Sequence, residues 1–327
     1  MDKDSKVVII GAGVFGLSTA VQLAIEGFKN VAVVDRHLPP VPDGSSCDIS
    51  RVIRFDYADE DYLNVSYEAY LKWSKDPKFK GIFHPASYIL TGSIGGDQSW
   101  IDRTTRQLSN KGLAWTKLGD AAAAKREFPI LSGKLAEPGF KGYYNDAAGW
   151  ADATKAIIQL RDECLELGVS FISGPAGTVV GFHTDSDNKI RSVQTLGGMS
   201  IPGDHFVLAA GAWSSNLVPM YNSTLATAQM AVHGWGYTRT PSKGEALIET
   251  NISTPRVYPS RERPNFCPSE GEERLRNGLR EILPELADRP FEKVTMCWYT
   301  DTPSGDFIMD YHPDYQNLFV GGAVSGQ

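Results

Sequence analysis

The sequence has 327 residues, which suggests two domains, and its hydrophobic content of 42% and charged content of 22% are ordinary for a globular protein. The formal net charge of -7 argues against nucleic acid and anionic membranes as partners. No apolar run approaches the roughly 20 residues of a membrane-spanning helix. The four cysteines lie far apart and form no C-x-x-C pair, so we expect no metal site.

The chain begins with a pattern that is typical of a dinucleotide-binding unit. Residues 7–10 are all apolar, as in a strand that is buried on both faces of a parallel sheet. The glycines that follow have G-x-G-x-x-G spacing, which allows a tight turn, close approach of a pyrophosphate and close packing of a helix from about residue 17 to 26. We therefore expect the cofactor phosphates at the residues of this turn, Gly11, Gly13, Val14, Phe15 and Gly16.

A second apolar strand, residues 31–34, ends at Asp35, which lies 19 positions after Gly16. A carboxylate at about this distance accepts hydrogen bonds from the ribose hydroxyls of an adenine dinucleotide. Strand, turn, helix, strand and acid occur in this order, so the pattern predicts such a cofactor. The unit alone leaves FAD and NAD both open.

The middle of the chain mixes helices and strands. Three prolines exclude a helix from the loop at residues 37–46. Beyond it we expect a helix over 62–75, a mixed insertion over 82–145, a helix from 149 to 167, a strand over 169–172, a hairpin from 177 with its turn at 185–188, and a buried strand over 205–214. Residues 224–265 show no clear pattern, and a helix over 270–283 and strands over 294–299, 307–309 and 318–320 follow.

Three separated motifs carry a family resemblance. They are Arg51-Val52-Ile53-Arg54, Ala209-Ala210-Gly211-Ala212-Trp213-Ser214 and Cys297-Trp298-Tyr299-Thr300-Asp301-Thr302-Pro303. Together they resemble the flavin amine oxidases of the monomeric sarcosine oxidase group. The sequence is most similar in pattern to the fungal branch that contains fructosyl amino acid oxidases (amadoriases), saccharopine oxidases and pipecolate oxidases.

The resemblance implies an α/β fold, α+β overall, in which a glutathione-reductase-type, Rossmann-like FAD-binding domain carries an inserted mixed-sheet substrate domain. The predicted boundaries are 1–82, 146–222 and 298–327 for the FAD-binding domain, and 83–145 and 223–297 for the substrate domain. The implied cofactor is therefore FAD. Besides the glycine turn and Asp35, we place in the cofactor site Arg36, Ser46, Arg51, Ala210, Gly211, Trp213 and Cys297.

In this family, the cysteine of the C-terminal motif carries FAD as a thioether on the flavin 8-methyl carbon. By position, that residue is Cys297. The alternative is a buried structural thiol, which is the commonest fate of a free cysteine. The sequence leaves covalent and non-covalent FAD both open.

The resemblance also implies that Arg54 binds the carboxylate of an amino-acid substrate and that Arg51 lies near the flavin ring, so both are candidate catalytic residues. A guanidinium is permanently charged and can bind a carboxylate through two hydrogen bonds. The alternative is that both arginines are solvated and paired with Asp48 and Asp56, which would contribute little stability.

The predicted function is FAD-dependent oxidation of a secondary amine in an N-substituted or cyclic L-amino acid. The expected partners are a small amino-acid-derived substrate and molecular oxygen, and we expect a monomer that is cytoplasmic or peroxisomal. Family members have a longer segment around Trp235 and a Ser-Gly-His-Gly-Phe-Lys run where this chain reads Ser325-Gly326-Gln327. A shortened, catalytically impaired family member is therefore one alternative, and an NAD-dependent dehydrogenase is another.

Overall fold

The structure is a computed structural model that describes residues 2–92, 98–218, 227–233, 238–240, 244–246, 269–291, 295–301 and 306–322. For the strands at 227–233, 238–240, 244–246 and 295–301 it describes the backbone without the side chains. Three features named above therefore lie outside the described residues, namely the thiol of Cys297, Trp235 and the terminal Ser325-Gly326-Gln327.

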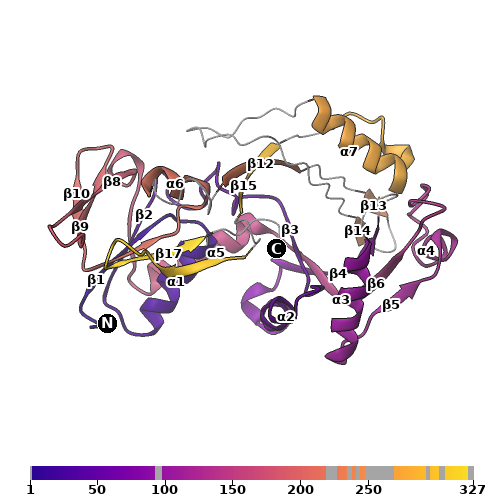
Figure 1. The fold of residues 1–327 in the computed structure, drawn as a ribbon, viewed down its shortest axis with the longest axis horizontal. Helices are drawn as coiled ribbons and strands as arrows, with labels where there is room; N and C mark the ends of the chain where they lie inside the picture. Colours follow the sequence, from indigo (N-terminus) through magenta and orange to yellow (C-terminus); the bar gives the residue numbers. More distant parts are fainter. Residues whose placement is uncertain are drawn as a thin grey trace.

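A six-stranded sheet forms the centre of one half of the molecule (Figure 1). Its neighbouring strands are parallel except for one pair at the edge of the sheet, β16 and β17 (residues 308–311 and 318–322), which is antiparallel. Strand β1 (Lys6–Ile10) lies between two parallel neighbours and is buried from Val7 to Ile10, which is why all four of these residues are apolar. In order across the sheet, the strands are β16 (Ile308–Tyr311), β17 (Leu318–Gly322), β11 (His205–Leu208), β1 (Lys6–Ile10), β2 (Asn30–Val34) and β7 (Ser170–Ile172).

Both faces of this sheet are covered. On one face, α1 (Val14–Ile25) and α5 (Ala153–Glu166) bury Leu17, Val21 and Ile157 against β1 and β2. On the other face, an antiparallel meander buries Ile190 and Val193 against β1 and β11. The meander consists of β8 (Val179–Thr184), β9 (Ile190–Thr195) and β10 (Ser200–Pro202), and its first two strands are the predicted hairpin.

A four-stranded antiparallel sheet forms the other half of the molecule. Figure 1 shows it beside α2, α3 and α4, away from the first sheet. Phe55 and Tyr143 are buried against the aromatic and apolar face of α2 and α3. The elements are β3 (Arg51–Ile53), β4 (Phe83–Thr91), β5 (Thr116–Leu118), β6 (Gly142–Ala151), α2 (Glu60–Lys75), α3 (Ser99–Asn110) and α4 (Ala121–Glu127).

The remaining described elements lie in the last third of the chain. Strand β12 pairs with β15 in antiparallel register, which places Ala231 opposite Cys297, and β13 pairs with β14. Their bounds are α6 (Ser214–Leu217), β12 (Thr227–His233), β13 (Thr238–Thr240), β14 (Gly244–Ala246), α7 (Ser269–Ile282) and β15 (Thr295–Asp301). The helix predicted over 270–283 and the three predicted C-terminal strands are confirmed within one or two residues.

Four predicted element boundaries are wrong. The helix predicted from residue 149 begins at Ala153, because residues up to Ala151 pair with β3 and β4 and Asp152 caps the helix by accepting the Lys155 amide hydrogen. Helix α2 begins at Glu60 because the Asp59 carboxylate accepts two amide hydrogens there. Helix α1 begins at Val14 rather than near residue 17, directly after the second glycine of the turn. The strand predicted over 205–214 ends at Leu208 and is followed by a 3-10 turn and α6.

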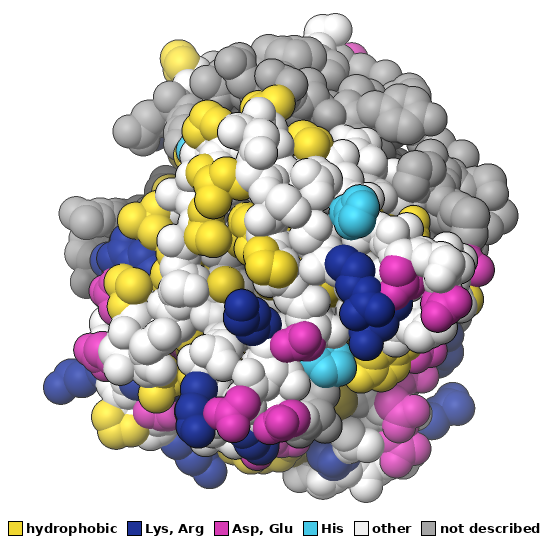
Figure 2. Space-filling view, turned by 90° about the vertical axis from the view of Figure 1, so that its left-hand side faces the viewer, with side chains coloured by type: hydrophobic (Ala, Val, Ile, Leu, Met, Phe, Trp, Pro, Cys, Tyr) yellow, Lys and Arg dark blue, Asp and Glu magenta, His cyan; other side chains and the backbone are white. Residues whose placement is uncertain are grey.

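The division into two domains stays a prediction. The two sheets agree with it in outline, whereas β6 runs through the boundary drawn at residue 146 and β3 belongs to the second sheet. In and beside the meander Val180, Leu196 and Met199 are 55%, 50% and 45% exposed, and Figure 2 shows hydrophobic side chains on the side of the molecule that lies at the left in Figure 1. Within the described residues, no helix has both the length and the apolar character needed to cross a membrane.

Candidate cofactor and substrate site

The glycine turn after β1 is shaped by the protein's own backbone. Gly11 has a φ of +111°, and a Cβ atom there would lie 2.3 Å from the carbonyl oxygen of Ala209. A Cβ atom at Gly16 would lie 1.9 Å from the carbonyl oxygen of Gly11. Gly13 differs, because a Cβ atom there would meet only the Ser46 hydroxyl oxygen, at 3.2 Å. Gly11 and Gly16 are therefore required by packing, whereas Gly13 keeps space open in front of the turn.

The amino end of α1 opens onto this space. The Val14 amide donates to the Ser46 hydroxyl oxygen at 3.0 Å, so the loop after Asp35 returns to the helix start. No acidic residue occupies the first turn of the helix, and its positive dipole end is therefore available for an anion. Gly13, Val14, Phe15 and Ser46 all line the adjoining cavity.

Asp35 follows β2 at the same edge of the sheet as the glycine turn. Its carboxylate accepts the Ala12 amide hydrogen and the Arg36 amide hydrogen, each at an N–O distance of 2.6 Å. Burial raises the pKa of Asp35 above its ordinary value, although these amides and the Arg36 charge act in the opposite direction. The carboxylate thus ties the end of β2 to the glycine turn and still lines the cavity.

Arg36 is held by a residue that the sequence did not single out. Its guanidinium binds Asp43 through two hydrogen bonds, at 2.7 and 2.9 Å, and lies 4.2 Å from the centre of the Trp213 ring. Asp43 is only 7% exposed, so the ion pair is shielded from water and pins the loop at 37–46. Ala210, Gly211 and Trp213 form the neighbouring wall of the cavity.

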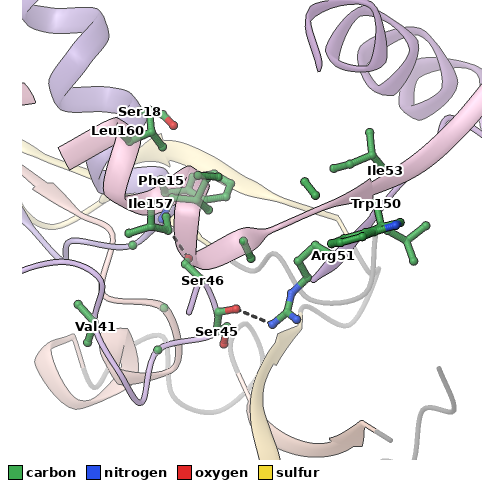
Figure 3. A pocket seen from close by; sticks show the side chains of 18 of the residues that line it. Phe15, Ser18, Val41, Ser45, Ser46, Arg51, Ile53, Trp150, Ile157 and Leu160 are labelled. Carbon is green, nitrogen blue, oxygen red and sulfur yellow. Dashed lines mark hydrogen bonds between the residues drawn. The ribbon is translucent and has the colours of Figure 1, made fainter. Parts of the chain in front are cut away.

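One large cavity connects the two sheets. Its volume is about 2390 Å³, and it runs from the carboxyl edge of the six-stranded sheet to β3, β4 and β6. Figure 3 shows Phe15, Ser46 and Ile157 on one side of this space and Arg51, Ile53 and Trp150 on the other. The carboxyl edge of a parallel sheet is where open α/β folds bind their ligands, so this cavity is the candidate site.

Arg51 enters the cavity from the start of β3. Its guanidinium forms an ion pair with Asp48 at 2.5 Å and donates to the carbonyl oxygens of Ser50 and Ser45, at 2.9 and 2.6 Å (Figure 3). The pairing with Asp48 that the alternative interpretation expected is therefore present. The side chain is only 33% exposed, however, and it lines the same space as the glycine turn.

Arg54 lies one residue beyond the end of β3 and is also a cavity residue. It is partly buried between aromatic rings, 4.3 Å from the Tyr57 ring centre and 5.5 Å from the Tyr88 ring centre. Burial alone would lower the pKa of Arg54, but Tyr88, Tyr57 and Asp56 together raise it, so the guanidinium stays charged. The alternative of a solvated Arg54 is therefore wrong, because the side chain is partly buried between two aromatic rings and lines the cavity.

The structure brings together most of the residues expected at the site. Gly11, Asp35, Arg36, Arg51 and Arg54 line one cavity although they come from both halves of the molecule. Sequence reasoning missed Asp43 and Trp150, and the strand character of residues 142–151 was the signal that could have identified Trp150. Among the described residues, no group of three or more His, Cys, Asp or Glu side chains could hold a metal ion.

Comparison with known proteins identifies the family. Residues 6–327 match the family described as FAD dependent oxidoreductase (DAO). L-saccharopine oxidase of Schizosaccharomyces pombe is 28% identical, over 98% of this chain and 85% of the relative. The mouse peroxisomal sarcosine oxidase is 25% identical, over 98% of this chain and 87% of the relative.

The fold agrees with a solved structure. The deglycating enzyme fructosamine oxidase of Aspergillus fumigatus (Amadoriase II) superimposes with a TM-score of 0.81 at 27% identity, over 100% of this chain and 83% of that chain. The predicted α/β fold class and family are thus confirmed. The chain belongs to the family of FAD dependent oxidoreductases.

Proposed function

We propose that this protein is an oxidase that removes a hydride from the carbon beside a secondary amine in an N-substituted or cyclic L-amino acid. Molecular oxygen would be the final acceptor and hydrogen peroxide the product. The observation that carries this proposal is that Arg54 lines the same cavity as the glycine turn. The named activities of the relatives, on saccharopine, sarcosine and fructosamine, support the same chemistry.

The cofactor region fits FAD in the features that this structure shows. Gly13 leaves open space before the amino end of α1, where a pyrophosphate would accept amide hydrogens. Asp35 presents a partly buried carboxylate to the same cavity, suited to ribose hydroxyls. When bound, FAD would supply the redox chemistry, which is to take up the hydride and return electrons to oxygen.

The protein's part would be to bind and orient the substrate. Arg54 is a charged, partly buried guanidinium between two aromatic rings, which suits the carboxylate of an amino acid. Arg51 would contribute positive charge beside the redox centre, partly offset by its ion pair with Asp48. Ile53 and Trp150, which lie near Arg51 in Figure 3, would provide an apolar wall and exclude water.

Replacing Gly13 by alanine should weaken FAD binding without unfolding the protein. The added methyl group meets only the end of the Ser46 side chain, but it fills space that the phosphates need. A poorly fitting methyl group costs roughly 1–3 kcal/mol, so affinity should fall by about 5- to 150-fold. Fluorescence titration of FAD-free protein measures this. Gly119→Ala, at an open position outside the cavity, is the matched control, and equal affinity in both variants would contradict the phosphate assignment.

We also propose that FAD is attached covalently to Cys297, as the family resemblance implies. Acid-precipitated protein should then remain yellow, and a peptide that contains Cys297 should gain the mass of FAD. The same test on Cys297→Ala should release all flavin into the supernatant. Release of all flavin from the unsubstituted protein would leave a non-covalent FAD site and reject the thioether.

The proposed activity is tested by peroxide release from a panel of secondary amines that includes saccharopine, sarcosine, pipecolate and a fructosyl amino acid. Amine-dependent peroxide and bleaching of the flavin absorbance are the expected result.

A second candidate function is that of a catalytically impaired family member, because the match to L-saccharopine oxidase extends over 374 positions against the 327 residues present here. Flavin that none of the amines bleaches would favour that candidate. A cytoplasmic or peroxisomal location and a monomeric state belong to the same proposal.

A further inference from the structure

The buried residue Asp56 lies next to Arg54 and carries a carboxylate that is shielded from solvent. Asp56 is 3% exposed, and the residues that hold it, Tyr143 and Asn145 of β6, are each 1% exposed. The Tyr143 hydroxyl donates to Asp56 at 3.1 Å, and the Asn145 amide donates to both carboxylate oxygens at 3.3 and 3.4 Å. We call Asp56, Tyr143 and Asn145 the Asp56 cluster.

The Asp56 cluster is joined directly to Arg54. The Arg54 guanidinium donates a hydrogen bond to the backbone carbonyl oxygen of Asp56. The chain therefore turns back on itself between Arg54 and Tyr57, whose ring lies over the guanidinium. On the other side, Tyr88 of β4 pairs in register with Asn145 of β6. Fixing the Asp56 side chain to β6 thus fixes the carbonyl group that holds Arg54.

A structural role alone does not account for a carboxylate at this position. Asp56 adjoins a cluster of apolar and aromatic side chains that includes Phe55, Leu63 and Tyr67. Burial raises the pKa of Asp56, so its ionised form is disfavoured there. Replacing a whole set of buried polar partners by apolar groups of the same shape is often neutral or stabilising. The carboxylate anchors Asp56 to Tyr143 and Asn145, and its charge favours the charged form of Arg54, which gives the buried group a function.

We propose that Asp56 is the positioning residue of Arg54, and that the Asp56 cluster thereby sets the preference for substrates that carry a carboxylate. This inference rests on the proposed role of Arg54 in binding the substrate carboxylate. A long arginine side chain loses conformational freedom when it binds a ligand. The carbonyl of Asp56 and the rings of Tyr57 and Tyr88 hold the guanidinium in one place before the ligand arrives, which reduces that loss.

The experiment compares three variants of the FAD-loaded protein with the unsubstituted chain. Tyr143→Phe removes one hydrogen bond to Asp56 with little change of shape, and Asp56→Asn removes the charge. Tyr144→Phe is the matched control, because this neighbouring hydroxyl donates to Glu127 and not to the cluster. Calorimetry measures the affinities for pyrrole-2-carboxylate and for the neutral pyrrole-2-carboxamide. FAD content and melting temperature report general damage to the site.

The affinity for the carboxylate should fall by about 3- to 10-fold in Tyr143→Phe, the scale of one ordinary hydrogen bond, and by about 10-fold or more in Asp56→Asn, the scale of a hydrogen bond to a charged group. The carboxamide affinity, the FAD content and Tyr144→Phe should stay unchanged. Tyr143→Phe alone decides the question if Asp56→Asn does not fold.

Arg54→Ala is measured beside these variants, and three other results would overturn the inference. If Tyr143→Phe binds the carboxylate as well as the unsubstituted protein while Arg54→Ala does not, the positioning role is wrong and the role of Arg54 stands. Equal loss of carboxylate and carboxamide affinity also rejects it, since the cluster would then be merely structural. If Arg54→Ala itself binds the carboxylate normally, the proposed role of Arg54 fails, and the positioning role fails with it.

Discussion

Arg54→Ala is expected to weaken the binding of a carboxylate ligand by about 30- to 5,000-fold. Removing one partner of a buried charge pair costs roughly 2–5 kcal/mol, which corresponds to this range. The large effect is expected because Arg54 is charged, partly buried and enclosed by the Tyr57 and Tyr88 rings, so water replaces it poorly. Titration of the flavin absorbance with pyrrole-2-carboxylate measures the affinity.

Arg54→Lys separates charge from geometry. A lysine keeps the positive charge but loses the planar pair of donors, so its affinity should lie between those of the unsubstituted protein and Arg54→Ala. Arg191→Ala is the control, because this arginine is paired with Asp185 in the meander and lies outside the cavity. If Arg54→Ala and Arg191→Ala both bind the acid normally in flavin-loaded protein, the carboxylate role of Arg54 is wrong.

Asp35→Ala should be the most damaging single change on the cofactor side. Loss of a charged hydrogen-bond acceptor costs roughly 1.5–3 kcal/mol, so non-covalent FAD affinity should fall by about 10- to 150-fold. The structure adds a second cause, since the same carboxylate accepts the amide hydrogens of Ala12 and Arg36. Without it, the glycine turn loses its tie to the end of β2.

The measurement is an FAD titration in a Cys297→Ala background, so that covalent attachment does not hide the affinity. Asp204→Ala is the matched control. Asp204 also accepts a backbone amide hydrogen, that of Lys6 at 2.8 Å, but it lies at the opposite edge of the same sheet. Unchanged FAD affinity in Asp35→Ala would exclude this carboxylate from ribose binding. A comparable loss in Asp204→Ala would show that the effect comes from the sheet as a whole.

The cofactor side of the site could be predicted because its signals are local. The turn from Gly11 to Gly16 and the acid Asp35 are read from spacing within one strand–helix–strand unit, and the structure places them at one edge of one sheet. The start of α5 shows where local signals mislead. The helix predicted from residue 149 would have Asp152 as a favourable acid in its first turn. Asp152 is instead the helix cap, because pairing with β3 and β4 keeps the residues before it extended up to Ala151.

The substrate side depends on contacts between distant parts of the chain. Asp56 contacts Tyr143 and Asn145, which lie 87 and 89 positions further on. The contact forms because β6 pairs with β3 in antiparallel register and so passes beside the segment that follows β3. No spacing rule predicts such a contact, and the same is true of Trp150 beside Arg51 (Figure 3).

The amino-acid sequence by itself determined the family, the cofactor class and the order of the main strands and helices. The family and the FAD cofactor come from the resemblance carried by three separated motifs, whereas the order of the strands and helices follows from hydrophobic periodicity and from glycines whose backbone geometry other residues cannot adopt. Tertiary structure decided that Arg54 is enclosed rather than solvated, that Arg36 is held by Asp43, and that the buried Asp56 accepts a hydrogen bond from Arg54 through its backbone carbonyl. The physical reason is that burial, and with it the strength of a charge, is a property of packed neighbours from different strands.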